Sequence, residues 1–233
     1  MRQLRPFFGY FGSKWKLARV YPDPAHELLI EPFAGSAGYS LRYPTKNVVL
    51  IEKNPRIAEL WKYLIRVPEQ TILALPDTLD ACACDAERTL IGMWWAKAPT
   101  APRTSQSSWC RNPVYAGSSW WGPKIRERIA NQLSAIRHWT CHCMSYQDLP
   151  DDITATWFVD PPYQIAGSSY PCGPRDIDYT ALGVWCKSRR GQTIVCEAVG
   201  ASWLPFAALH CIKTRRINSK SKHQEAIWVS ESR

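Results

Sequence analysis

Between residues 27 and 67, apolar runs typical of buried strands alternate with segments of helical periodicity. The runs ELLIEPF and NVVLIEKN, which begin at Glu27 and Asn47, are rich in Leu, Ile and Val. The first is followed by the small-residue turn AGSAG and by GYSLRYP, an expected helix that Pro44 ends. The second is followed by PRIAELWKYLIRV, which opens with Pro55 and has apolar spacing near the helical period. This alternation predicts a parallel sheet with helices on its faces.

The remainder of the chain continues the α/β pattern. Two further helices are expected, PKIRERIANQLSAIRHW, which has a basic polar face, and DYTALGVWCKSRRG, which Gly191 ends. Further strands are expected around residues 140–145 and at TWFVD, QTIVCEAV, ALHCIKT and EAIWVS. The total is about seven strands, mostly parallel. The last two are joined by a basic loop rather than a helix, so we expect them to be antiparallel.

The size of the chain indicates one domain that spans residues 1–233. With 233 residues, of which 45% are hydrophobic and 12 are Trp, it can bury a substantial core. The N-terminal stretch MRQLRPFFGYFGSKWK has basic residues on both sides of a very short apolar patch, which is not typical of a signal peptide. No apolar run approaches the length that spans a membrane. We therefore expect a soluble cytoplasmic protein.

The nine cysteines are an odd number without a regular framework, so reduced thiols are expected. Two close pairs, Cys82 with Cys84 and Cys141 with Cys143, raise the possibility of zinc. Their C-x-C spacing differs from the usual C-x-x-C, and the second pair lies in an expected strand. We favour buried small hydrophobes over zinc and predict no metal site.

The net charge of +9 suits a polyanionic partner. One basic group lies in KTRRINSKSKH and comprises Lys213, Arg215, Arg216, Lys220 and Lys222. A second group lies near the start of the chain and comprises Arg2, Arg5, Lys14, Lys16 and Arg19. The two groups are interpreted as a rim that faces phosphates, and the alternative is a solvated charged loop.

The segment from Gly92 to Gly122 follows no structural period and is interpreted as an insertion. It contains five Trp together with basic residues. Aromatic and cationic side chains in one segment suit base stacking and phosphate contact, which makes Trp109 and Arg111 candidate DNA-contact residues. The alternative is that the Trp side chains pack against the body of the protein, which we expect for most of them.

Acidic residues stand at the ends of three expected strands. In TWFVDPPYQ, the prolines forbid continuation of the strand, so Asp160 is presented at the carboxyl edge of the sheet, where open α/β sheets bind ligands. Glu31 precedes the small-residue turn, and Glu52 ends the next strand about twenty residues later, a position typical of an acid that binds a ribose diol. These features favour an adenosine-containing ligand, and the alternative is strand caps and ordinary turns.

The motifs YFGSK, EPFAG and DPPY, in this order over nearly the whole chain, resemble those of the Dam-type, alpha-class N6-adenine DNA methyltransferases. These are compact enzymes common in phages and restriction systems, and INSKSKHQEAIWV is similar to the end of phage-type members. The resemblance implies a class I, Rossmann-like methyltransferase fold. It also implies S-adenosylmethionine as cofactor and double-stranded DNA as partner.

The resemblance also assigns residues. It implies that Tyr10 and Lys14, with Gly12 between them, lie at the pocket for cofactor and target base. It places Glu31 near the methionine amino group and Glu52 at the ribose hydroxyls. Along the cofactor it implies Phe33, Ala34 and Gly35. The chain departs from the family at Glu52, where Asp is usual, and at Ala37, where the family has a second glycine and Gly38 follows here.

The chemistry of DPPY follows from its functional groups. The adenine amine is a poor nucleophile because its nitrogen shares the lone pair with the ring. Hydrogen bonds to the Asp160 carboxylate and the Pro161 carbonyl would make the nitrogen tetrahedral and aim the lone pair at a sulfonium methyl group. Acceptors alone are needed, and the prolines, Pro161 and Pro162, donate nothing from their own nitrogens. None of the cysteines needs to act as a nucleophile.

The last residue of DPPY, Tyr163, offers a stacking face of roughly 1–3 kcal/mol to a base that costs a few kcal/mol to flip. In the Gly- and Ser-rich segment that follows, Tyr170 and Arg175 are candidate DNA contacts. Two alternatives remain open. One is an amino-methyltransferase for cytosine N4 or RNA adenine, and the other is a catalytically silent DNA-binding module.

Overall fold

The computed structural model describes residues 3–108, 110–111, 120–165, 174–209 and 224–232. Its seven-stranded sheet has the order β3-β2-β1-β4-β5-β7-β6. The strands are β1 (Leu28–Glu31), β2 (Asn47–Ile51), β3 (Thr140–His142), β4 (Thr154–Val159), β5 (Arg190–Ala198), β6 (Ala207–Ala208) and β7 (Glu225–Ser232). The first five are parallel, whereas β7 runs antiparallel to both β5 and β6. This confirms the expected mostly parallel, Rossmann-like α/β sheet with an antiparallel last strand.

The helices are α1 (Pro55–Arg66), α2 (Glu69–Leu73), α3 (Asp85–Trp94), α4 (Pro123–Leu133) and α5 (Tyr179–Ser188). Single 3-10 turns lie at η1 (Lys14–Lys16), η2 (Ala18–Val20), η3 (Ser40–Arg42), η5 (Ser134–Ile136), η6 (Tyr146–Asp148) and η7 (Pro174–Asp176). The chain order and the expected α1, α4 and α5 are confirmed, whereas α2 and α3 were not predicted. Within the described residues, no helix is both long and apolar enough to cross a membrane.

Four sequence expectations were wrong in extent. The helix expected to run to Trp139 ends at Leu133, where the 3-10 turn η5 follows. GYSLRYP forms only η3, because Tyr43 precedes proline and takes a non-helical ψ of 56°. Helix α5 ends at Ser188, and Gly191 lies inside β5 with φ of 90°, where a Cβ would meet the Ala155 carbonyl oxygen at 2.3 Å. The strand at ALHCIKT begins one residue earlier, and β6 contains two residues. Its residues 210–214 lie outside the described part.

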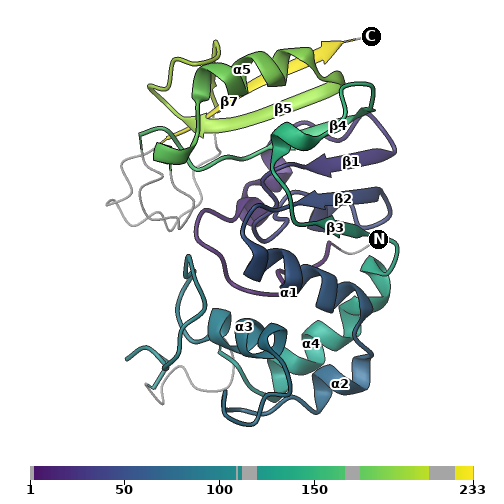
Figure 1. The fold of residues 1–233 in the computed structure, drawn as a ribbon, viewed down its shortest axis with the longest axis vertical. Helices are drawn as coiled ribbons and strands as arrows, with labels where there is room; N and C mark the ends of the chain where they lie inside the picture. The colour runs from purple at the N-terminus through teal and green to yellow at the C-terminus, as the bar shows by residue number, and fades with distance from the viewer. Residues whose placement is uncertain (1–2, 109, 112–119, 166–173, 210–223, 233) are drawn as a thin grey trace.

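Both faces of the sheet are covered, because successive strand residues point to opposite sides. Leu29 and Phe158 belong to one apolar cluster, together with α1, α4 and the N-terminal segment. Ile30 and Trp157, their chain neighbours, belong to a second cluster with α5. In Figure 1, α5 lies beside β5, whereas α2, α3 and α4 gather at the opposite end of the molecule, beyond β3.

The strand order creates a switch point between β1 and β4. From β1 the chain adds β2 and β3 on one side, then returns to place β4 and β5 on the other side of β1. Loops that leave the carboxyl ends of β1 and β4 therefore diverge and leave a crevice between them. Open α/β sheets bind ligands at this position.

Candidate functional site

A cleft lies at this switch point, with an empty volume of about 1050 Å³ that is partly open to solvent. Ten residues predicted from the sequence line it, namely Tyr10, Gly12, Lys14, Glu31, Phe33, Ala34, Gly35, Glu52, Asp160 and Pro162. The fold thus brings YFGSK, EPFAG and DPPY together from the N-terminal segment and from the ends of β1, β2 and β4. Pro161 and Tyr163 adjoin the cleft through the chain but are not among its lining residues.

The centre of the site is a buried ion pair between Lys14 and Asp160. The Lys14 Nζ lies 2.7 Å from Asp160 Oδ1 and 3.0 Å from Oδ2, and it also donates to the Gly12 carbonyl at 3.0 Å. Burial would lower the pKa of Lys14, but the charges of Asp160 and Glu225 outweigh it and raise that pKa. Lys14 therefore stays cationic at neutral pH.

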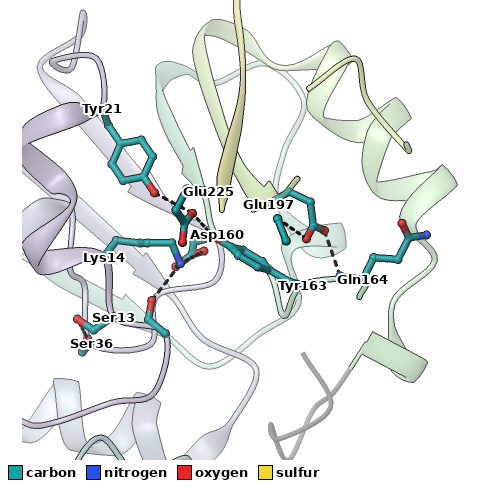
Figure 2. A network of polar contacts seen from close by, with 11 residues as sticks. Ser13, Lys14, Tyr21, Ser36, Asp160, Tyr163, Gln164, Glu197 and Glu225 are labelled. Carbon is teal, nitrogen blue, oxygen red and sulfur yellow. Dashed lines mark hydrogen bonds and ion pairs between the residues drawn. The ribbon is translucent and has the colours of Figure 1, made fainter. Parts of the chain in front are cut away.

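Asp160 has a pKa raised from 3.8 to about 6, because burial and the nearby charges of Glu225 and Glu197 outweigh the attraction of Lys14. The carboxylate is therefore ionised at neutral pH but has a far higher proton affinity than an exposed Asp. Figure 2 shows its two oxygens turned toward the Lys14 ammonium group. The site therefore presents an ionised acceptor at neutral pH.

The other two predicted acids are held by backbone amides. Glu31 is 2% exposed and accepts a 2.7 Å hydrogen bond from the Ser40 N–H. Burial raises its pKa from 4.5 to about 8, although that bond opposes the rise. Glu52 accepts from the Gly35 N–H at 2.9 Å and the Asn54 N–H at 2.8 Å, and burial raises its pKa also. Glu52 therefore ties the small-residue turn to the end of β2.

The turn after β1 depends on close backbone approach. A Cβ on Gly38 would meet the backbone nitrogens of Lys14 and Trp15 at 2.7 Å, so glycine there lets YFGSK pack directly on the turn. Gly35 takes φ of 47° beside the Tyr10 ring. Ala37, the residue that departs from the family pattern, takes φ of 52°, so the turn keeps a left-handed conformation despite the Cβ.

The DPPY segment is fixed by hydrogen bonds on its side away from the cleft. The Tyr179 hydroxyl donates to the Pro162 carbonyl at 2.5 Å, and the Tyr163 hydroxyl donates to Glu225 at 2.5 Å. Among the described residues, no donor contacts the Pro161 carbonyl. Asp160 and Pro161 therefore retain acceptor capacity, whereas Pro162 and Tyr163 are already bound.

The Tyr163 ring also contacts Lys14. The Lys14 Nζ lies 4.6 Å from the centre of the Tyr163 ring, so one face of the ring carries a cation. Burial raises the pKa of Tyr163, which keeps its hydroxyl protonated as a donor. The ring is thus held both at its face and at its tip.

Sequence reasoning missed several residues of the site. The first group surrounds DPPY and comprises Tyr21, Tyr179, Glu197 and Glu225. The second group lines the far part of the cleft and comprises Ser145, Tyr146, Gln147, Asp176, Ile177 and Asp178. Glu197 carried a usable signal, because it lies at the carboxyl end of a buried strand as Asp160 does. Glu225 carried none, because its place depends on the direction of β7.

The predicted DNA contacts fall mostly outside the described residues, namely Trp109, Tyr170, Lys213, Arg215, Arg216, Lys220 and Lys222. Arg111 and Arg175 are exposed and do not line the cleft. The first residues of the expected insertion, 92–94, belong to α3. Of its tryptophans, Trp95 and Trp120 are buried, whereas Trp94 and Trp121 are partly buried and bond to carbonyl groups of the body. These four therefore pack against the protein.

The cysteines do not form a metal cluster within the described part of the chain, where no group of three or more His, Cys, Asp or Glu could hold an ion. Cys82 and Cys141 are buried, whereas Cys143 is exposed.

A scan against models of known protein families found no match, and no curated protein was significantly similar to the chain. The motifs and their geometry are therefore the basis for a functional proposal.

Proposed function

We propose that the protein is an S-adenosylmethionine-dependent methyltransferase that modifies the N6 amino group of adenine in double-stranded DNA, as the resemblance to Dam-type enzymes implies. One observation carries the proposal. Asp160 of DPPY lines the same cleft as Glu31 and the EPFAG turn. A methyl donor at the turn and an amine at Asp160 would therefore share one space. The mostly parallel sheet with an antiparallel last strand agrees with the class I methyltransferase fold.

The residues of the cleft fit the cofactor. Glu31 is buried and forms no ion pair with any described residue, so its carboxylate suits the ammonium group of the methionine moiety. A bound ammonium group would favour the ionised form of Glu31 and lower its raised pKa. Glu52 suits the ribose hydroxyls, since a carboxylate has about four lone-pair sites and its backbone partners are Gly35, Lys53 and Asn54. Phe33 and Tyr146, with ring centres 5.2 Å apart, supply apolar surface beside them.

The reaction follows from the two acceptors of DPPY. S-adenosylmethionine supplies a methyl group on a positively charged sulfur. The flipped adenine would donate one amine proton to the Asp160 carboxylate and one to the Pro161 carbonyl, which aims the nitrogen lone pair into the cleft. The nitrogen gains the methyl carbon, the sulfur keeps the electron pair of the broken bond, and one proton leaves the amine.

Asp160 suits the role of proton acceptor. Its pKa of about 6 leaves it ionised at neutral pH yet raises its affinity for the released proton. Lys14 holds the carboxylate in place and balances its charge before the base arrives. The mechanism uses no covalent enzyme intermediate, so the chain's cysteines take no part in it.

The DNA partner is supported by the described residues that flank the cationic sequence 213–222, which itself lies outside the described part of the chain. The described residues on either side of it, Leu209 and Gln224, lie at the same edge of the sheet as the cleft. The Leu209 N–H bonds to the Glu225 carbonyl at 2.8 Å, and the Val199 N–H to the Gln224 carbonyl at 2.8 Å. The sequence between these two described residues contains five cations, which suits contact with phosphates near the site.

The direct test incubates the protein with labelled S-adenosylmethionine and plasmid DNA, then digests the DNA and identifies the labelled nucleoside. The proposal expects N6-methyladenine, and mapping then gives the recognised sequence. Label on cytosine N4, or on RNA alone, would replace the substrate and keep the chemistry. Absence of any label would overturn the proposal.

The DNA partner is tested separately by the salt dependence of binding. Changing Lys213, Arg215 and Arg216 together to Ala should weaken binding to every DNA sequence and reduce the slope of log K against log salt by about 3. The exposed cations Lys187 and Arg190, at the opposite edge of the sheet, supply the control and should leave the slope unchanged. An unchanged slope in the triple variant would remove the segment from the interface.

A further inference from the structure

The antiparallel direction of β7 gives the site a residue from the end of the chain. Parallel strands present their carboxyl ends at the cleft, but an antiparallel neighbour presents its amino end there. The first residue of β7, Glu225, pairs with Ala198, the last residue of β5. Figure 2 shows Glu225 at the start of β7, between Tyr21, Lys14 and Tyr163.

Glu225 accepts two tyrosine hydroxyls on the same oxygen. Its Oε2 lies 2.5 Å from the Tyr163 hydroxyl and 3.2 Å from the Tyr21 hydroxyl. Tyr21 is 4% exposed, and its ring packs edge-on against Phe158 with centres 5.3 Å apart. The acceptor is therefore anchored to the core on one side and to DPPY on the other.

These contacts set the orientation of the Tyr163 ring. An aromatic ring on a loop is otherwise free to turn about its two side-chain torsions, whereas a ring bound at its tip keeps one plane. The Lys14 ammonium group lies over one face of this plane and also bonds to Asp160. A shift of the ring would therefore move the cation and, with it, the carboxylate that receives the amine.

We propose that Glu225 is a positioning residue for methyl transfer, which holds the Tyr163 ring and, through Lys14, the Asp160 carboxylate in reactive geometry. This inference rests on the proposed function. Glu225 does not line the cleft, so it acts through residues that do. Removing it should therefore impair turnover and leave cofactor affinity intact.

The test is a double-mutant cycle with Glu225→Ala and Tyr163→Phe in the full-length chain, read by kcat and by the KM for S-adenosylmethionine. Glu225→Ala should lower kcat about 10²-fold with the cofactor KM unchanged, since small misplacements near a reacting centre have effects of that size. The double variant should be no slower than Glu225→Ala, because the two changes break the same contact. Glu225→Gln keeps an acceptor oxygen and should recover at least a tenth of wild-type kcat.

A matched pair elsewhere supplies the control. The Tyr43 hydroxyl donates to Asp23 at 2.5 Å, and neither residue lines the cleft. Asp23→Ala and Tyr43→Phe should lower the melting temperature at most and leave kcat unchanged. If Glu225→Ala does not fold, Glu225→Gln takes its place in the cycle and should show the same non-additivity.

Three results separate the possible failures. Wild-type kcat in Glu225→Ala, or kcat losses that multiply in the double variant, would overturn the positioning role while the proposed function stands. A raised cofactor KM with unchanged kcat would also overturn it, because it would place Glu225 in cofactor binding. A wild-type protein that labels no DNA would instead overturn the proposed function, and the positioning role with it.

Discussion

Among the residues that the structure describes, two buried cations pair with aspartates, one at each edge of the parallel strands. At the carboxyl edge, Lys14 pairs with Asp160. At the amino edge, Arg189, which is 2% exposed, pairs with Asp151, which is 87% exposed. Arg189 also donates to the Pro150 and Trp185 carbonyls at 3.0 and 3.2 Å, and its guanidinium group contacts the rings of both Trp157 and Trp185.

The difference lies in what each aspartate can still do. Asp151 is hydrated and adjoins no cleft, so its pair with Arg189 holds the start of β4 against the end of α5. Asp160 is only 19% exposed, lies near other acids, has a raised pKa and lines an open cleft. A buried cation is therefore no sign of a functional site by itself. A partner carboxylate with spare acceptor capacity beside a cavity is such a sign.

The largest expected effect separates the two aspartates by activity. Asp160→Ala removes the amine acceptor and should lower kcat by about 10³-fold or more, with cofactor binding largely intact. Asp151→Ala should leave kcat within about twofold, because a hydrated carboxylate contributes little. Methyl transfer to plasmid DNA and calorimetric titration with S-adenosylmethionine measure both quantities. Full activity in Asp160→Ala would refute the assigned role.

The two cations should show the opposite balance between activity and stability. Without Lys14, whose charge and hydrogen bond lower the pKa of Asp160, that pKa rises and less of the carboxyl stays ionised at neutral pH, so Lys14→Met should lower kcat about 10²-fold. Arg189→Met should leave kcat per folded molecule unchanged and reduce the free energy of unfolding by roughly 2–4 kcal/mol, because packing and carbonyl hydrogen bonds are lost. Urea unfolding and initial rates measure the pair. Equal losses of activity in both variants would erase the contrast.

A third prediction concerns the free energy of unfolding, which should fall as rising pH ionises the buried Glu31. The folded pKa of Glu31 is about 8 against 4.5 in the unfolded chain, so unfolding releases a proton between these values. The contribution of Glu31 to stability is therefore full below pH 4.5 and is lost as pH rises toward 8. Glu31→Gln should be more stable than wild type at pH 9 by up to about 5 kcal/mol, since the pKa rises from 4.5 to about 8 and each unit is worth about 1.4 kcal/mol. At pH 4 the difference should disappear.

Urea unfolding at both pH values tests this prediction, with the exposed Glu27→Gln as control. Glu27 precedes β1 and pairs with Lys46 at the surface, so its variant should change stability little at either pH. The same Glu31→Gln protein should bind S-adenosylmethionine more weakly. A Glu31→Gln variant that is less stable than wild type at pH 9 would show that this carboxylate supports the fold.

The smallest expected effect concerns Ala37. Glycine at this left-handed position would relieve about 1–2 kcal/mol of strain. It would also add unfolded-state entropy, at about 0.5–1 kcal/mol, and lose a buried methyl group worth about 0.8 kcal/mol. Ala37→Gly should therefore change the free energy of unfolding by less than about 1 kcal/mol. A loss above 2 kcal/mol in urea unfolding would mean that the methyl group has a packing role beyond its area.

The sequence predicted the sheet well because parallel strands buried on both faces are continuous apolar runs. Helix α3 was not predicted, because its buried face includes Glu87 and Thr89, which interrupt the apolar period. Glu87 is buried only because it bonds to the Ala83 N–H at 2.7 Å and the Tyr63 hydroxyl at 3.2 Å. The tertiary fold brings Tyr63 to Glu87, whereas Ala83 is a local partner at the start of the helix, and neither bond leaves a mark on the apolar periodicity.

The candidate site likewise contains residues that the sequence predicted and residues that it did not. Asp160, Glu31 and Glu52 were predictable because strand ends are visible in the sequence and their carboxyl edge is shared. Tyr21 and Glu225 were not predictable, because they lie 204 residues apart in the chain. They meet only through the pairing register of β7 with β5. Acids at strand ends were thus easier to predict than the residues that later strands and loops bring to them.

The place of Glu225 links the chemistry to the completion of folding. The first five strands already bring Lys14, Glu31 and Asp160 together, so a chain without β7 would have a recognisable cleft but a loose Tyr163. Heat, proteolytic cleavage or strain on the tail could each separate β7 from β5. Such a separation should abolish the proposed reaction before the cleft itself is lost. Pairing of the last strand would then be the step that completes the site.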